Sequence, residues 1–311
     1  MTPDRPNDAC GRLEVIAAGL TCTVQDLGRP GHAHEGVPPS GAADAASHRL
    51  ANRLVGNDET DATLEATLGG LVVRLAGGGP ARAVALTGAP APLRVAGRPA
   101  PLYAPVAVRP GDVVELGTPA HGLRSYLAVA GGVDAAAELG SRSTDVLSGL
   151  GPPPLTAGDT IPLGRPPAAA ATAVDVAPTR GGGGRGTTAL AVVAGPRDDR
   201  LGPGGWERLL ATTWTAASTS NRIGVRLDGP ALATVAGELP PEGVVTGAVQ
   251  VPPGGKPVVF LTDHPVTGGY PVVAVLADDE AVAAAAQIRP GQEVRFRLAG
   301  ASPARSPSGW Q

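Results

Sequence analysis

Three segments of the sequence collect polar side chains among glycines and prolines. The first runs from Thr23 to Asp44 and contains Gln25, Asp26, Arg29 and Ser40. Its glycines let a ligand approach the backbone closely, and the Arg29 guanidinium could clamp a carboxylate or a phosphate. The alternative is a structural entry from strand to turn to helix, in which Asp26 and Arg29 pair with each other. Both interpretations stay open at this stage.

The second segment, Ser220 to Arg226, places two guanidinium groups and an amide around one glycine. These groups belong to Asn221, Arg222 and Arg226. Guanidinium groups suit an anion, because each presents a fork of hydrogen-bond donors. Two exposed charges on a strand would produce the same pattern, so anion binding is one of two interpretations.

The third segment, Glu242 to Leu276, contains Gln250 on an expected strand and a polar turn from Asp263 to Tyr270 between two apolar strands. His264 lies in this turn and could serve as acid, base or hydrogen-bond donor near neutral pH. A lone histidine in a loop is more often only solvated. The turn is therefore a candidate site, with His264 as its reactive group.

Other motifs point away from nucleotide and metal chemistry. The glycines of residues 181–186 match a dinucleotide fingerprint only in form, since neither a strand nor a helix flanks them. Lys256 follows two glycines but precedes Pro257, where a P-loop needs a serine or threonine. His32 and His34 supply too few ligands for a metal, so we expect solvated loop histidines and no metal site. The sequence contains no G-x-S-x-G motif for a nucleophile elbow.

The elements that must position these residues are mainly short strands. Most apolar segments are short, rich in β-branched residues and bounded by glycine or proline, which is typical of strands and turns. One pattern occurs three times, as RPGDVVELG from Arg109, TAGDTIPLG from Thr156 and RPGQEVRFR from Arg289. Each copy predicts a tight turn that leads into a strand with one buried face.

Helices are expected to be few. The spacing of apolar residues predicts a helix over Ser40–Val55, with Ser40 or Asp44 as its cap and a stop at the following glycine. Trp206–Ala211 and Asp279–Ile288 are shorter candidates.

Length and composition favour a folded protein of two domains. Of the 311 residues, 42% are hydrophobic and 17% are charged, whereas chains that stay disordered are poor in apolar residues and rich in charge. We expect an N-terminal β-domain over residues 13–165 and a C-terminal β-domain over residues 189–300. A flexible linker rich in glycine, alanine and proline is expected between them, over residues 166–188.

The charge balance disfavours two classes of partner. The formal net charge is −3, so no strong field attracts nucleic acid or an anionic membrane surface. No apolar run approaches the roughly 20 residues of a membrane helix, and we see no secretory signal. Cys10 and Cys22 form neither a disulfide framework nor a paired metal motif. We expect a cytoplasmic protein.

A longer set of motifs carries a family resemblance. In order from about Leu13 to Leu298, the sequence contains TVQDLGRPG, GVPPSGAAD, LEATLGG, LTGA, YLAVAGG, GSRSTD, SNRIGVRLDGP, EGVVTGAVQVPPGGKPVVFLTDHPVTGGYP and RPGQEVRF. Together these motifs resemble the biotin-dependent carboxyltransferase family, also described as allophanate hydrolase subunit 2, whose bacterial members are mostly the C subunit of 5-oxoprolinase. The segment Arg165–Thr188 departs from the family, because it is longer and richer in glycine and alanine than the usual connection between domains.

The resemblance implies a mainly β chain with two cyclophilin-like β-barrel domains and few short helices. It also implies a ligand site between the domains or at a partner subunit. In 5-oxoprolinase, partners of the A and B types complete a complex that opens the lactam 5-oxoproline to L-glutamate with ATP and Mg, and the resemblance does not say which of the proteins binds ATP. On the matching motifs we assign catalytic roles to His264, Asp26 and Arg29. We assign substrate binding to Gln25, Ser40, Asn221, Arg222, Gln250, Thr267, Gly268, Gly269 and Tyr270.

Two further functions stay open. Lys256 is the only lysine and lacks the methionine-flanked context of a biotinyl-lysine, so we expect no biotin on this chain. The chain could receive biotin on another protein and act as a carboxyltransferase component that moves carboxyl from carboxybiotin to urea or a similar amide. It could also be a non-catalytic regulator that binds a kinase-inhibitor-type partner subunit. We favour the role in 5-oxoprolinase, because a chain of this length leaves no room for a fused carboxylase.

Overall fold

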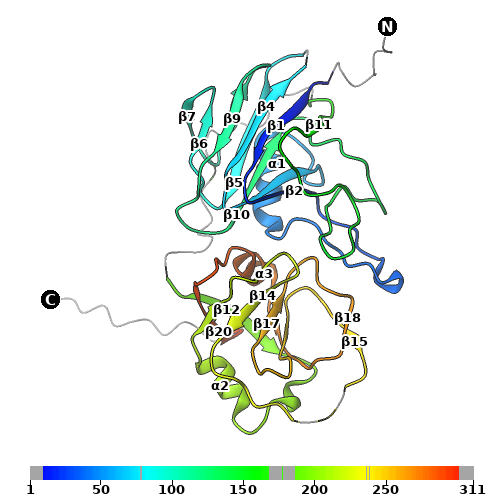
Figure 1. Ribbon diagram of the computed structural model, residues 1–311, viewed down its shortest axis with the longest axis vertical. Coiled ribbons are helices and arrows are strands. Elements are labelled where there is room, and N and C mark those ends of the chain that lie inside the picture. The colour runs from blue at the N-terminus through cyan, green and yellow to red at the C-terminus, as the bar shows by residue number, and fades with distance from the viewer. Residues whose placement is uncertain are drawn as a thin grey trace, which may run out of the picture.

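The computed structural model describes residues 10–77, 79–167, 177, 186–235, 237 and 239–300. Within these residues the chain is mainly β with three short α-helices, which confirms the predicted fold class. Its strands form an N-terminal region and a C-terminal region, which are the upper and lower bodies in Figure 1. Each region has its own apolar core.

The N-terminal region consists of two antiparallel sheets. One has the strand order β11-β1-β4-β9-β6-β7, and the other has the order β2-β3-β10-β5-β8. Buried side chains of both sheets share one core, as Leu71 and Leu127 do. The strands are β1 (Arg12–Ala18), β2 (Thr21–Gln25), β3 (Thr63–Thr67), β4 (Leu71–Ala76), β5 (Arg82–Gly88), β6 (Leu93–Val95), β7 (Arg98–Ala100), β8 (Val106–Val108), β9 (Val113–Leu116), β10 (Arg124–Val129) and β11 (Thr160–Pro162).

The C-terminal region is a closed barrel with the strand order β12-β19-β16-β17-β14-β13-β20. Its first strand, β12, pairs in parallel with its last strand, β20, and this pairing closes the barrel. Trp214 and Leu209 are fully buried in its core. The strands are β12 (Thr188–Ala194), β13 (Trp214–Ala216), β14 (Gly224–Asp228), β16 (Ala248–Gln250), β17 (Val258–Phe260), β19 (Val272–Leu276) and β20 (Glu293–Leu298), and β15 (Glu242–Gly243) pairs with β18 (Thr267–Gly268) beside the barrel.

The helices lie close to where the sequence predicts them. Helix α1 (Ala45–Val55) begins at Asp44, whose side chain accepts a hydrogen bond from the amide of Ser47, and it ends at Gly56 in the left-handed conformation. Ser40 is therefore not the cap, and the helix starts five residues later than the predicted range. The other helices are α2 (Gly205–Ala211) and α3 (Asp279–Ala286), and short 3₁₀ turns are η1 (Ala33–Glu35) and η2 (Asp198–Arg200).

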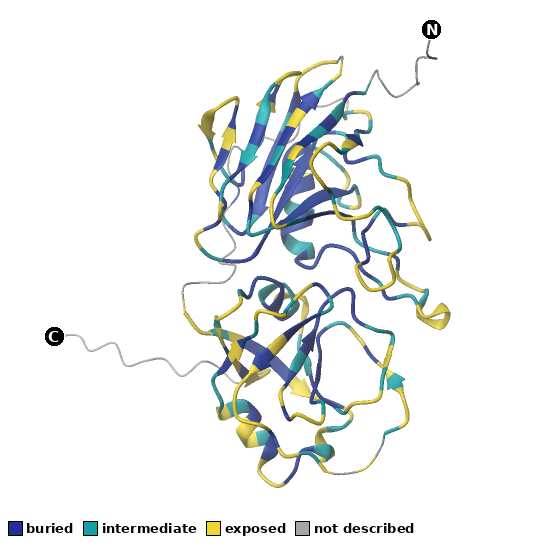
Figure 2. Ribbon diagram, in the orientation of Figure 1, coloured by how far each residue is buried: buried dark blue, intermediate teal, exposed yellow. Residues whose placement is uncertain are grey.

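Helix α1 explains why strand β10 is buried on both faces. All six residues of β10 are buried. One face contributes Leu127 to the core between the sheets, while Tyr126 on the other face packs in a cluster with Ala51 and Leu54 of α1. Figure 2 shows this central part of the N-terminal region as buried. No helix in the described ranges is long and apolar enough to cross a membrane.

The three repeated motifs form the same turn, as predicted. In the copies from Arg109 and Thr156, the first residue accepts the amide of the fourth through its carbonyl, and its own amide donates to the fourth residue's carboxylate. In the copy from Arg289, Gln292 takes the place of the aspartate. The turns lead into β9, β11 and β20, respectively.

The predicted linker falls largely outside the described residues, which omit 168–176 and 178–185. Its flexibility therefore stays a prediction, as does the fingerprint-like run of glycines within it. Ala177 is described, and it is buried, with its amide donating to the carbonyl of Tyr103. At this one residue the connection packs against the N-terminal region.

Candidate functional site

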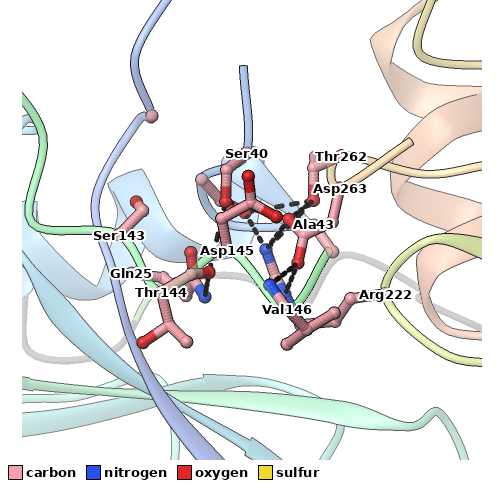
Figure 3. A network of polar contacts seen from close by, with 12 residues as sticks. Gln25, Ser40, Ala43, Ser143, Thr144, Asp145, Val146, Arg222, Thr262 and Asp263 are labelled. Atoms are coloured by element: carbon pink, nitrogen blue, oxygen red, sulfur yellow. Dashed lines mark hydrogen bonds and ion pairs between the residues drawn. The ribbon is translucent and has the colours of Figure 1, made fainter. Parts of the chain in front are cut away.

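A buried arginine joins the two regions. Arg222 precedes β14, and its guanidinium lies between Glu65 of β3 and Asp263 of the C-terminal polar turn. Nη1 donates to Glu65 Oε1 at 2.6 Å, while Nη2 and Nε donate to the two oxygens of Asp263 at 2.9 and 3.0 Å. Figure 3 shows the Arg222 and Asp263 part of this network. The structure thus places Arg222 in an ion-pair bridge, whereas Arg226 is one of the exposed strand charges considered from the sequence.

The charges of this bridge stabilise one another. Burial alone would raise the pKa of Glu65, but the guanidinium groups of Arg222 and Arg124 hold that pKa below its ordinary value. Burial likewise opposes the charge of Arg222, and the neighbouring Asp263 and Glu65 nevertheless raise its pKa. Both directions favour the charged forms of Glu65 and Arg222. Removing one partner of such a buried set leaves an uncompensated charge.

A second set of contacts ties β10 and α1 to the end of α3. Arg124 Nε lies 3.3 Å from Glu65 Oε1. The Gln287 side chain accepts from the amides of Leu123 and Arg124, at 2.8 and 2.9 Å, and donates to Asp44 Oδ2 at 2.9 Å. The domain junction is therefore a cross-linked polar interface.

The Gln25–Arg29 loop is held by the segment of residues 138–144. Asp26 accepts hydrogen bonds from the hydroxyls of Ser141 and Ser143 and from the amides of Gly28 and Arg142. Arg29 donates to the carbonyls of Glu138 and Ser143. Asp26 and Arg29 thus form no ion pair with each other in the described structure, so the predicted pairing is wrong, although both side chains bond to neighbouring parts of the chain, as the structural alternative expects. Ser143 connects them, since it donates to one and accepts from the other.

Gln25 and Ser40 approach a single carbonyl in the same segment. Gln25 Nε2 donates to the Thr144 carbonyl at 2.9 Å, and Ser40 Oγ lies 3.2 Å from the same oxygen. Ser40 Oγ is also 2.9 Å from Asp263 Oδ1, and its proton can serve one acceptor at a time. Ser40 adopts a positive φ of 52°. The contact between Ser40 and Asp263 therefore links the first candidate segment to the third across the junction.

His264 keeps one nitrogen available. It is buried, its Nδ1 lies 2.8 Å from the Pro265 carbonyl, and its ring packs at a tilt against Phe260. A carbonyl only accepts, so the proton is on Nδ1, and Nε2 has no hydrogen-bond partner among the described residues. Burial lowers the pKa of His264 below its ordinary value. The solvated-loop alternative is wrong, and the ring can act as a neutral base through Nε2.

The remaining predicted binding residues lie in the Asp263–Tyr270 turn, in the neighbouring strand β16 and in the turn before β14. Gln250 is buried and donates to the carbonyl of Tyr270 at 2.9 Å, while Thr267 and Tyr270 are exposed. Gly268 lies against Gln250, and a Cβ on Gly269 would meet only the Leu239 carbonyl oxygen, at 3.8 Å. Asn221 is exposed and uses its side-chain oxygen to accept the amide of Ile223, so it shapes its own turn.

Several residues of the junction were not predicted. Four of them lie in motifs that carried the family resemblance, namely Glu65, Tyr126, Ser143 and Thr144. Arg124 begins β10, and Gln287 caps the end of α3. Tyr126 donates to Glu65 Oε2 at 2.8 Å and accepts the amide of Asp44 at 2.7 Å. One sequence feature could have indicated Glu65: it is a charged residue in the middle of the strand TLEAT, whose first four residues are buried.

The two histidines weighed as metal ligands in the sequence lie at η1. His32 Nδ1 lies 2.5 Å from Glu35 Oε2 across η1, and His34 is exposed. Across the described ranges, no group of three or more His, Cys, Asp or Glu side chains is arranged to hold a metal ion.

Comparison with known proteins gives a consistent picture. Residues 35–298 match the family described as carboxyltransferase domain, subdomain A and B. The chain is 36% identical to the C subunit of Escherichia coli 5-oxoprolinase, over 91% of this chain and 90% of that protein. It is 32% identical to urea amidolyase of Lachancea kluyveri, over 91% of this chain but 17% of that protein. The crystal structure of the K. lactis urea amidolyase superimposes with a TM-score of 0.85 at 29% identity, covering 95% of this chain and 19% of the other.

Proposed function

The chain belongs to the carboxyltransferase-domain family, and from this premise we propose that it is one component of a 5-oxoprolinase complex that opens 5-oxoproline to L-glutamate. The observation that carries the proposal is the 36% identity to the C subunit of Escherichia coli 5-oxoprolinase, which extends over nine-tenths of both chains. The urea amidolyase relatives, in contrast, extend far beyond the matched part.

The reaction explains the need for ATP. Opening the lactam adds water across its C–N bond, so that the ring carbon becomes a carboxylate and the nitrogen becomes a free amine. The lactam is a stable amide, and phosphorylating its oxygen makes the ring carbon electrophilic and creates a good leaving group. We therefore propose an ATP- and Mg-dependent reaction, which suits the cytoplasmic location favoured by the sequence.

In this proposal His264 contributes a base. Its Nε2 is unprotonated and has no partner among the described residues, while the adjacent Asp263 is fixed by Arg222. The base would take a proton from an attacking water, and the fixed neighbour would hold the turn in place. Thr267 and Tyr270, which are exposed on the same turn, would contact the substrate.

The turn around Lys256 does not fit a nucleotide phosphate. Residues 252–257 connect β16 and β17 as a hairpin turn, with the amide of Gly255 donating to the carbonyl of Pro252. Lys256 is followed by Pro257 and donates to Asp228. The hydroxyl and the helix start that a P-loop uses are missing at this turn. We derive no step through ATP here and propose that it binds to the partner proteins.

Reconstitution tests the proposal. We expect the purified chain alone to be inactive on 5-oxoproline, and glutamate to form when 5-oxoprolinase partners of the A and B types, ATP and Mg are added. Omitting this chain from the mixture is the control. Robust turnover by the chain alone would overturn the claim that it acts in a complex, and no glutamate from the complete mixture would overturn the proposed reaction.

Carboxyl transfer to urea is the second candidate, because relatives named urea amidolyase match 91% of the chain. Urea and 5-oxoproline are both small amide-like molecules, so one site chemistry could serve either. We expect no biotin attached to this chain, and carboxybiotin would arrive on another protein. The same preparation, supplied with a biotin carboxylase partner, bicarbonate, ATP and urea, would form carboxyurea only if this second function holds.

A further inference from the structure

The outer wall of the C-terminal barrel carries a hollow separate from the domain junction. It has a volume of about 340 Å³ and lies over β14 and β17, which are neighbours in the barrel (Figure 1). The turn that contains Ser218 and Thr219 borders one side, and the hairpin that contains Gly254 borders the other. A hollow of this size holds a small molecule.

Three charged side chains line the hollow and leave one positive charge in excess. Arg226 and Asp228 point outward from β14, because both are exposed at alternate positions of that strand. Lys256 pairs with Asp228 across the strands, with Nζ 2.7 Å from Oδ1. The Arg226 guanidinium has neither an ion pair nor a hydrogen bond to another described residue. This contrasts with Arg222, whose guanidinium is fully engaged.

The other lining groups limit the kind of ligand. Ser218 and Thr219 add hydroxyls, and the backbone at Gly254 has no heavy atom within 4 Å of the position where a Cβ would stand. Pro252, Pro257 and Val258 supply apolar surface. One free guanidinium beside apolar surface suits a singly charged carboxylate with a short hydrocarbon body, whereas a phosphate dianion would lack a second free cation.

We propose that this hollow binds a small organic monocarboxylate. The Arg226 guanidinium forms a two-pronged pair with the carboxylate, and Lys256, shared with Asp228, contributes a weaker contact. Arg226 follows Arg222 by four residue steps, which span at most about 14 Å, so the hollow lies near the junction but uses none of its groups. The site does not depend on the proposed lactam-opening function.

Calorimetric titration of the full chain tests the site with butyrate, acetate and inorganic phosphate as probes. We expect saturable binding, tightest for butyrate because its hydrocarbon body contacts the proline-lined wall. Arg226→Gln should weaken butyrate binding about tenfold and Lys256→Gln about threefold, since charge-assisted contacts of exposed groups are partly screened. Asp228→Asn should strengthen binding, because it removes the competing negative charge.

The matched control is Arg297→Gln, which removes another exposed arginine from β20 on the same barrel. It should leave butyrate binding unchanged, and equal weakening by this variant would show that only overall charge matters. No saturable binding, or phosphate binding as tightly as butyrate, would also overturn the proposal.

The single lysine provides a second measurement. An amine-reactive reagent labels Lys256, and peptide mapping by mass spectrometry separates that label from the chain's N-terminus. Saturating butyrate should slow labelling of Lys256 severalfold in the wild-type chain and leave it unchanged in Arg226→Gln. Labelling that butyrate does not slow in either chain would count against the site.

Discussion

The Gln25–Arg29 loop and the Asp263–Tyr270 turn contain similar residue types but use them differently. In the first, Asp26 takes four hydrogen bonds from its own chain, and Arg29 donates to two backbone carbonyls. In the second, Asp263 is engaged by Arg222, while His264 keeps Nε2 available and Tyr270 is exposed.

The difference shows that a polar residue in a glycine-rich motif has two possible roles. It can satisfy the backbone of a loop that has no regular structure, or it can face a ligand. In the first loop Asp26 and Arg29 bond to the chain itself, whereas in the second Asp263 is bound by Arg222 and the adjacent His264 keeps Nε2 available. Variants that separate stability from activity test this distinction.

The largest effect is expected at the bridge between the regions. Arg222→Met leaves the Asp263 carboxylate buried without a counter-charge, and it leaves Glu65 with Arg124 as its remaining guanidinium partner. The free energy of unfolding should therefore fall by about 3–5 kcal/mol. Chemical denaturation measures this loss. Arg226→Met, four residues away and exposed, should change stability by less than about 0.5 kcal/mol. A loss below about 1 kcal/mol for Arg222→Met would contradict the bridge.

The next largest loss of stability is expected at His48, a buried histidine whose two ring nitrogens both have hydrogen-bond partners. His48 in α1 contacts Thr63 Oγ1 and the Glu59 carbonyl, and burial lowers its pKa to about 4 from an ordinary 6.5. As pH falls from 6.5 to 4, the unfolded chain takes up this proton first, so stability should drop by about 3 kcal/mol. Denaturation at both pH values should show this drop reduced in His48→Gln. An equal drop in both chains would show that His48 is not responsible.

Within the first loop, Asp26→Asn should lower stability by about 2 kcal/mol, because bonds from Ser141, Ser143 and two amides lose their charged acceptor. Thermal unfolding measures the change. A reconstituted complex that contains the folded Asp26→Asn chain should turn over 5-oxoproline at the wild-type rate. A loss of turnover at unchanged stability would instead return Asp26 to the catalytic role assigned from the sequence.

In the Asp263–Tyr270 turn, we expect a substitution to affect turnover more than stability. His264→Gln preserves much of the side-chain volume but removes the base, so turnover by the complex should fall about tenfold or more. Its melting temperature should stay close to that of the wild type. Steady-state kinetics and thermal unfolding on the same preparation separate the two effects, and near-wild-type turnover would place the base elsewhere.

The smallest effect concerns two adjacent glycines. A Cβ on Gly268 would stand 2.7 Å from Gln250 Nε2, whereas one on Gly269 would meet nothing closer than 3.8 Å. Gly268→Ala should therefore lower stability by about 1 kcal/mol, and Gly269→Ala should be nearly neutral. Equal melting temperatures for the two variants would show that the Gln250 contact is not tightly packed.

Features that depend on a few neighbouring residues could be predicted from the sequence. The repeated turns follow from a glycine beside a polar residue, and the stop of α1 follows from Gly56. Its start was placed too early, because Ser40 and Asp44 are both cap-forming types and the pattern does not distinguish them. The expectation of two domains came from length and composition, and their description as β-barrels came from the family resemblance. Only the C-terminal region forms one closed sheet in the structure.

The junction could not be predicted in the same way. Glu65 and Arg222 are far apart in the sequence, and no local period indicates that they meet. The chemistry of His264 was predicted from its type, but the free Nε2 depends on the neighbouring carbonyl. The burial of Arg29 and its bonds to two backbone carbonyls could not be predicted either, and its role toward a ligand stays a prediction.

The pairing of β12 with β20 has a consequence for biosynthesis. Thr188 lies opposite Val294 in this pair, so the barrel cannot close until nearly the whole chain has left the ribosome. Until then Glu65 lacks Arg222, although the strand that carries it is already complete. The N-terminal sheets therefore begin to fold while Glu65 has Arg124 beside it but Arg222 has not yet been translated, and contacts of such long range slow folding.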